Sequence, residues 1–149
     1  MKLSNRPLVL GFYGNSSSGK TTLIERLLVE LKHNKYRIAV IKVSGHPVSL
    51  DENGKDTERF SRAGANPVVL ASSTSTTYLV NKSCEEAEIV SHLQHMAQLD
   101  FIFIEGSRDK KIPKIRLDER AIRDNTLLKY DGNFVKLLDF ITQLLEKEK

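Results

Sequence analysis

The residues best suited to chemistry form a short glycine-rich segment near the start of the chain, GNSSSGKT at residues 14–21. It matches the Walker A pattern G-x-x-x-x-G-K-[ST], with an apolar strand expected before it and an amphipathic helix after it. Its glycines let backbone N–H groups turn onto phosphate oxygens, and the helix N-terminus adds a favourable partial charge. Lys20 is expected to reach the β- and γ-phosphates, and Thr21 to bind Mg²⁺. The predicted nucleotide-binding residues are Gly14, Asn15, Ser16, Ser17, Ser18, Gly19, Lys20, Thr21 and Thr22.

A nucleotide–Mg²⁺ site also needs a carboxylate, and the most apolar stretch of the chain, DFIFIEG at residues 100–106, carries one at each end. As a strand it separates Asp100 from Glu105 by about 16 Å. Ligands of parallel sheets bind beyond the carboxyl ends of the strands, so only Glu105 can face the phosphates. We predict that Glu105 binds Mg²⁺, directly or through water, or positions the attacking water. Lys20 and Glu105 are the predicted catalytic residues, and Asp100 is expected to cap the strand or lie on the surface.

Three further charged residues lie at or after the end of the second expected strand in the sequence. The loop that follows it contains Asp51 and Asp56, which fit a metal site or an ordinary solvated loop equally well. Lys42, at the end of the strand itself, fits contact with phosphate or with solvent.

The chain alternates apolar runs with helical patterns, which predicts an α/β fold with a mostly parallel, open sheet and helices on both faces. We expect one P-loop nucleotide-binding domain over residues 1–149. The expected strands cover residues 7–14, 36–44, 66–73, 75–81, 100–106 and 113–117, and the expected helices cover residues 20–34, 56–65, 84–99 and 133–149.

Composition narrows the cellular setting. No apolar run approaches the roughly 20 residues of a membrane span, so no membrane association is expected. The single cysteine, Cys84, excludes an intrachain disulfide, and a cytoplasmic location is expected. The net charge of +4 is scattered, and its one dense cluster, residues 108–116, has no interleaved aromatic residues. A basic rim near phosphate or a solvated loop explains it better than nucleic-acid binding.

Two other patterns are weak. NKSC at residues 81–84 begins like the guanine-reading N-K-x-D motif of Ras-like GTPases, but Cys84 replaces the aspartate that accepts two donors from guanine. His92 and His95 share the spacing of one helix face, yet a zinc site needs more ligands, so we interpret them as surface residues.

Taken together, three segments resemble the molybdopterin-guanine dinucleotide biosynthesis protein B (MobB) family. They are the glycine loop, residues 37–65 with GKDTERFSRAGA, and residues 100–115 with EGSRDKKIPKI; with their order and spacing they span about residues 7–117. The resemblance implies a P-loop α/β fold, GTP and Mg²⁺ as ligands, weak GTP hydrolysis and a homodimer. It also implies assistance to the partner enzyme that attaches GMP to molybdopterin. Gly14, Gly19, Lys20 and Thr21 would bind phosphate and Mg²⁺, and Asp51, Asp56 and Glu105 would be metal-side or switch-like acids.

The chain departs from the family in two places. The family tends to have an H-x-H-H stretch, where this chain has Val43 and Gly45 and keeps only His46. It also tends to read EGFK where this chain reads EGSR, residues 105–108. These changes leave the phosphate site intact and bear on the surface that faces pterin or partner. The glycine loop is shared by several classes, so a P-loop small-metabolite kinase remains an alternative to a slow GTPase that acts as an accessory protein. A diverged nucleotide-dependent binding module, with the final helix as a partner surface, is a further alternative.

Overall fold

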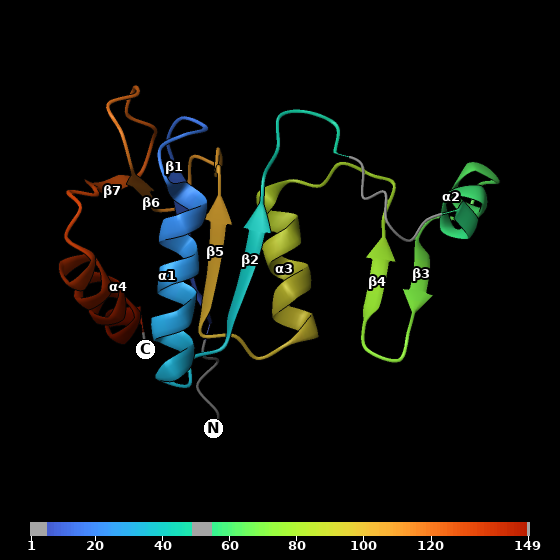
Figure 1. Cartoon of the computed structure of the whole chain (residues 1–149), viewed down its shortest axis with the longest axis horizontal. Coiled ribbons are helices and arrows are strands. Elements are labelled where there is room, and N and C mark those ends of the chain that lie inside the picture. Colours follow the sequence, from blue (N-terminus) through green and yellow to red (C-terminus); the bar gives the residue numbers. More distant parts are fainter. Residues whose placement is uncertain (1–5, 49–54, 149) are drawn as a thin grey trace. The chain divides into compact units, whose positions relative to one another are not determined.

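In the computed structural model, which describes residues 6–48 and 55–148, five parallel strands form the sheet that was expected (Figure 1). The strand order is β2-β5-β1-β6-β7. The elements in chain order are β1 (Leu8–Tyr13), α1 (Lys20–His33), β2 (Ile38–Lys42), α2 (Lys55–Arg62), β3 (Val68–Ala71), β4 (Thr76–Leu79), α3 (Glu86–Met96), β5 (Phe101–Glu105), β6 (Lys114–Arg116), β7 (Thr126–Lys129) and α4 (Phe134–Glu148).

Helices cover both faces of this sheet, as predicted, because the central strands are apolar on both sides. Phe101 and Phe103 of β5 pack with buried leucines of α1 and α4, whereas Ile102 and Ile104 face the partly buried side chains of α3. Such strands, buried on both faces, are typical of parallel sheets. The register aligns β1 with β5 and with β6, so the carboxyl ends of all five strands lie at one edge.

The final helix belongs to the core. Leu137, Ile141 and Leu145 of α4 are buried in the cluster that includes β1 and α1. The structure thus favours the packing role of this helix over the alternative of a partner surface for its apolar face.

The strands outside the core differ in part from what was expected. Residues 66–73 and 75–81 do contain strands, β3 and β4, but within the described residues these pair with each other as an antiparallel hairpin and not with the parallel sheet. Both strands are short and mostly exposed, so they lack the two apolar faces that a central parallel strand needs. The strand β7 was not expected at all, because its four residues follow a long polar stretch.

The contacts divide the chain into two compact units. One contains Met1–Val43 and Glu85–Lys149, with the parallel sheet, and the other is Ser44–Cys84, with α2 and the β3–β4 hairpin. Over the described ranges, no helix combines the length and apolar character that crossing a bilayer requires.

Candidate functional site

The glycine loop joins the end of β1 to the start of α1, at the carboxyl edge of the sheet. Two of its positions favour glycine. A Cβ on Gly14 would lie 2.4 Å from the Ser18 hydroxyl oxygen, and Gly19 has φ of 82°, in the left-handed region. The fixed glycines of the motif therefore allow the loop to close on itself and the helix to begin at Lys20.

The start of α1 is suited to an anion. Among the described residues no side chain caps this helix terminus, and its first turn, where Thr21 and Thr22 are exposed, contains no acidic residue. The Ser18 hydroxyl oxygen is buried and has no hydrogen-bond partner among the described residues. Uncapped N–H groups and an orphaned hydroxyl next to them are the donors that a phosphate group would satisfy.

Lys20 lies across the mouth of the loop. Its Nζ donates to the backbone oxygens of Gly14 at 3.0 Å and Asn15 at 2.6 Å. An ammonium group has three N–H donors, so one remains for a phosphate oxygen. The side chain is thus held where the motif requires a cation.

Thr21 and Glu105 lie in contact, although 84 residues separate them in the sequence. The Thr21 hydroxyl donates to both Glu105 carboxylate oxygens at 3.1 Å. The contact arises because β5 is the neighbour of β1, so Glu105 at its end faces the first turn of α1. A hydroxyl and a carboxylate are the hard oxygen ligands that Mg²⁺ prefers, and the pair fits such an ion.

The two ends of β5 have different roles. Lys42 Nζ lies 3.9 Å from Glu105 Oε1, so this lysine faces the carboxylate rather than bulk solvent alone. At the other end, Asp100 accepts the backbone N–H of Arg37 at 2.8 Å and its Nε at 3.3 Å, which fastens the start of β5 to β2. Asp100 is a structural residue of the far edge.

The two remaining predicted acids, Asp51 and Asp56, belong to the second compact unit. Asp51 lies outside the described residues. Asp56 is exposed on α2, in the second unit, where its carboxylate is 4.0 Å from Arg59. Within the described ranges, no group of three or more histidine, cysteine or acidic side chains could hold a metal, and His95 hydrogen-bonds the Ser91 backbone oxygen.

The structure adds two residues that sequence reasoning missed, Asp118 and Arg120, in the turn after β6. The Asn15 backbone N–H donates to Asp118 at 2.6 Å, and Arg120 NH2 lies 2.5 Å from Asn15 Oδ1. The hydrogen bond from the Asn15 backbone, then that from Arg120, lowers the pKa of Asp118, with the charges of Arg120 and Lys20 acting in the same direction. Asp118 is therefore a carboxylate that fastens the glycine loop.

Arginine side chains gather next to this turn. Arg123 NH1 donates to the Ser107 backbone oxygen at 2.6 Å, and its guanidinium lies 4.8 Å from the centre of the Tyr13 ring. Burial lowers the pKa of Arg123, and the charges of Arg120 and Arg108 lower it further. Lys20 and Arg120 contact the loop itself, and this positive charge favours an anionic ligand.

The segment after Glu105 is held by two buried charged residues, Glu86 and Lys114. Glu86 accepts the Ser107 hydroxyl at 2.6 Å and the Arg108 N–H at 2.6 Å. Lys114 Nζ donates to the backbone oxygens of Ile112 at 2.6 Å, Asp124 at 3.2 Å and also Asp109. Ser107, where the family tends to have phenylalanine, is thus part of a fixed structure. Burial lowers the pKa of Lys114, against the opposing charges of Glu86 and Asp109.

The family model and the relatives that match this chain point to the same family. The family model described as "Molybdopterin guanine dinucleotide synthesis protein B" (MobB) matches residues 9–142. The chain is 37% identical over 126 residues to a "Molybdopterin-guanine dinucleotide biosynthesis adapter protein" of Haemophilus influenzae, which covers 80% of this chain and 68% of that protein. It is 41% identical over 111 residues to a "Putative molybdopterin-guanine dinucleotide biosynthesis adapter protein" of Methanocaldococcus jannaschii, which covers 72% of this chain but 45% of that protein.

Solved structures agree on the fold. "The Crystal structure of Bacillus subtilis MobB" superposes with a TM-score of 0.70 at 16% identity, over 91% of this chain and 96% of that one. "Crystal Structure of molybdopterin-guanine biosynthesis protein B (mobB)" superposes with a TM-score of 0.64 at 23% identity, over 93% of this chain and 99% of that one. The P-loop α/β fold class predicted from the sequence is confirmed.

Proposed function

Because the chain belongs to the MobB family, we propose that it binds GTP and Mg²⁺ at its glycine loop and serves as an adapter in the attachment of GMP to molybdopterin. The observation that carries the nucleotide part is the contact of Thr21 with Glu105 at 3.1 Å, next to an uncapped helix start. The adapter role comes from the names of the relatives.

Each residue of the site has a distinct task in this proposal. The loop N–H groups and Lys20 bind the phosphate chain, and Thr21 with Glu105 holds Mg²⁺ directly or through water. When bound, Mg²⁺ would neutralise charge on the β- and γ-phosphates. Glu105 would also orient an attacking water, and Asp118 keeps the loop in shape through Asn15. Slow GTP hydrolysis is the activity we propose for this set.

The wider setting is also part of the proposal. We propose a cytoplasmic homodimer that meets molybdopterin or its GMP-transferring enzyme, as an adapter would. The client surface is expected to differ from that of relatives near Val43, Gly45 and His46, where the family's histidine stretch is altered. GTP and the partner thus rest on family membership, whereas phosphate binding also rests on the site's own contacts.

The structure favours an adapter over the alternative of a small-metabolite kinase. A kinase usually adds a lid that carries cations, and the basic segment at residues 107–116 is the one that could supply them. The backbone of Arg108 and Asp109 is fastened to Glu86, and Lys114 holds two carbonyls of the same segment. A segment whose backbone is hydrogen-bonded to both Glu86 and Lys114 is poorly suited to open and close over an acceptor.

The proposal is tested in a reaction that contains molybdopterin, GTP, Mg²⁺ and the GMP-transferring enzyme of a relative. Adding this chain is expected to raise the rate at which molybdopterin guanine dinucleotide forms, while phosphate release from GTP without any acceptor stays slower than the roughly 1–100 s⁻¹ of kinases. An unchanged rate of dinucleotide formation, together with phosphate transfer to a small-molecule acceptor, would establish the kinase instead.

A further inference from the structure

The end of β7, the strand that the sequence did not predict, carries an exposed carboxylate, Asp131. We propose that Asp131 binds the Watson–Crick edge of a guanine base whose phosphates lie in the glycine loop, and that it makes the site prefer guanine to adenine nucleotides. The inference deepens the proposed function and rests on its nucleotide binding.

The position of Thr21 and Glu105, the residues proposed to hold Mg²⁺, sets the direction in which a nucleotide would lie. β1 lies between β5 and β6, and Glu105 at the end of β5 contacts Thr21. A Mg²⁺ ion held by Thr21 and Glu105 would neutralise the β- and γ-phosphates, so these groups would belong on the β5 side of the loop. The α-phosphate and the nucleoside then extend toward the opposite side, over the ends of β6 and β7.

The register brings Asp131 to the level of the loop. Tyr13 pairs with Arg116, and Arg116 pairs with Lys129, so these residues lie side by side across three strands. Gly14 directly follows the first of them, and Asp131 lies two residues after the last. Two strand spacings, about 9–10 Å, separate β1 from β7, a distance that a nucleotide spans between its phosphates and its base.

Asp131 is fixed and still has room for a ligand. Its Oδ1 accepts the Asn133 N–H at 3.0 Å, and its Oδ2 accepts Lys136 Nζ at 2.9 Å. An ionised carboxylate has about four acceptor positions, so two remain. The hydrogen bond from Lys136, then that from Asn133, lowers the pKa of Asp131, so the group is ionised at neutral pH.

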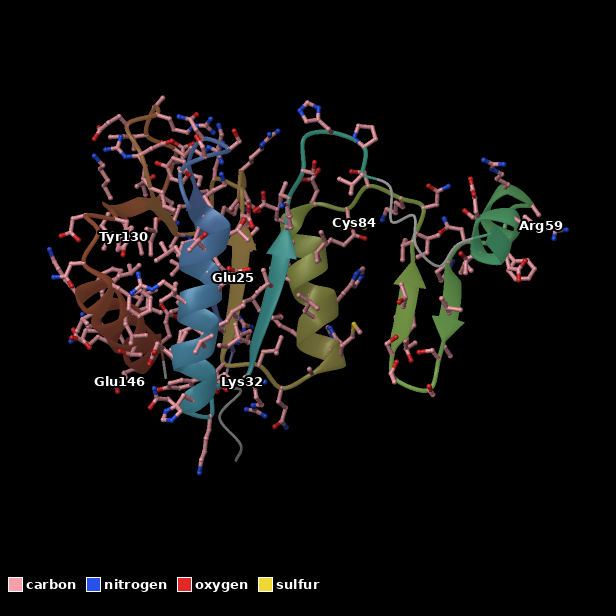
Figure 2. All side chains as sticks on the ribbon, viewed as in Figure 1. Glu25, Lys32, Arg59, Cys84, Tyr130 and Glu146 are labelled. Carbon is pink, nitrogen blue, oxygen red and sulfur yellow. The ribbon has the colours of Figure 1, made fainter. Side chains whose placement is uncertain are left out.

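A groove of about 640 Å³ adjoins this carboxylate, between β7 and α4. Leu128, Tyr130 and Phe140 supply apolar walls, and Asp131 and Asn133 supply polar atoms. Tyr130, labelled in Figure 2, lies on the chain between the two elements and packs partly against the core. Apolar surface beside a few polar groups is what the faces and the edge of a purine require.

The chemistry selects guanine. Its N1–H and 2-amino group are neighbouring donors, and one carboxylate accepts both. Adenine has no donor at N1 or C2, so it leaves the carboxylate without these two bonds. A site built to hydrogen-bond a group discriminates strongly against an analogue that lacks it.

The sequence supports this location. The K-x-D part of the guanine-reading motif, which fails at residues 81–84, occurs intact at Lys129–Asp131, with Leu128 in place of the asparagine. Leu128 packs partly against the core, so the asparagine position has a structural role here. The other strand-end carboxylate on this side, Asp118, accepts the backbone N–H of Asn15 in the glycine loop itself, so it supports the loop rather than the base.

The test compares GDP and xanthosine diphosphate (XDP) in Mg²⁺ by isothermal titration. In xanthine an oxygen replaces the 2-amino group, so an asparagine can donate to that oxygen while accepting N1–H. Asp131→Asn is expected to weaken GDP binding about 10- to 100-fold and to gain XDP binding by a similar factor. Asp139→Asn, in the same groove on α4, is the matched control and should bind GDP like the wild type.

Each outcome decides the question. A reversal of preference from GDP to XDP in Asp131→Asn alone would establish Asp131 as the reader of the base. Two results for Asp131→Asn would overturn this assignment: unchanged affinity for GDP, or weaker GDP binding with no gain of XDP binding at an unchanged melting temperature. Neither result would contradict the proposal that the wild type binds GTP at its glycine loop. Failure of the wild type to bind GDP or GTP would overturn the proposed function and this inference together.

Discussion

Replacing Glu105 by glutamine is expected to lower the rate of GTP hydrolysis by about 100-fold. The amide keeps the shape of the side chain and the contact with Thr21, but it cannot take a proton from water and binds a cation more weakly. Affinity for Mg²⁺–GTP should fall less than the hydrolysis rate, by under about tenfold, since the loop and Lys20 still bind the phosphates. Single-turnover hydrolysis and isothermal titration measure the two effects separately.

Asp100→Asn is the matched control, because it makes the same chemical change at the opposite end of β5, where Asp100 contacts Arg37 and no predicted ligand. Its hydrolysis rate should remain near that of the wild type. Equal losses of affinity and turnover in Glu105→Gln would show that Glu105 mainly anchors the metal. An unaffected rate would remove Glu105 from the reaction altogether.

Replacing Lys114 by methionine is expected to lower the free energy of unfolding by about 2–4 kcal/mol. The lysine is fully buried, and its ammonium group donates to three backbone carbonyls from two separate loops. Each carbonyl that loses a buried donor costs about 1–3 kcal/mol, and the removed cost of burying a charge offsets part of this sum. The midpoint of thermal unfolding should fall by about 5–15 °C.

Lys111→Met provides the comparison for this variant, since Lys111 is exposed on the same segment. Urea unfolding of both proteins should show the loss for Lys114→Met alone. If the free energy of unfolding of Lys114→Met equals that of the wild type, the cost of burying the ammonium group is as large as the stabilisation from its three hydrogen bonds. In that case the fold of residues 107–125 would depend on other contacts, such as those of Glu86.

The parts of the site that could be predicted follow from local rules. The glycine loop is a continuous motif, and Glu105 follows from the rule that ligands bind at the carboxyl ends of parallel strands. The sheet and its covering helices were predictable because β1 and the first four residues of β5 are apolar and α1 has a helical period.

The parts that were missed depend on contacts between distant segments. Asp118 follows β6 and Asp131 follows β7. The rule that selected Glu105 would have selected Asp118 had it been applied to β6, and Asp131 had β7 been predicted. β7 has only four residues, half of them exposed, and it gains its stability from pairing with β6. The burial of Lys114 likewise depends on two loops that meet around its side chain. No hydrophobic periodicity in the sequence predicts that these loops come together.

The proposal that this loop holds a guanine nucleotide is tested most directly by parallel titrations of GTP, GDP and ATP in Mg²⁺ into the wild type and Lys20→Ala. GTP and GDP should bind the wild type, ATP far more weakly. Lys20→Ala should weaken GTP binding by about 1.5–3 kcal/mol, or 10- to 150-fold. Lys32→Ala, on the last turn of the same helix (Figure 2), should leave it unchanged. Binding of ATP without GTP, or equal GTP affinity in Lys20→Ala, would contradict the account.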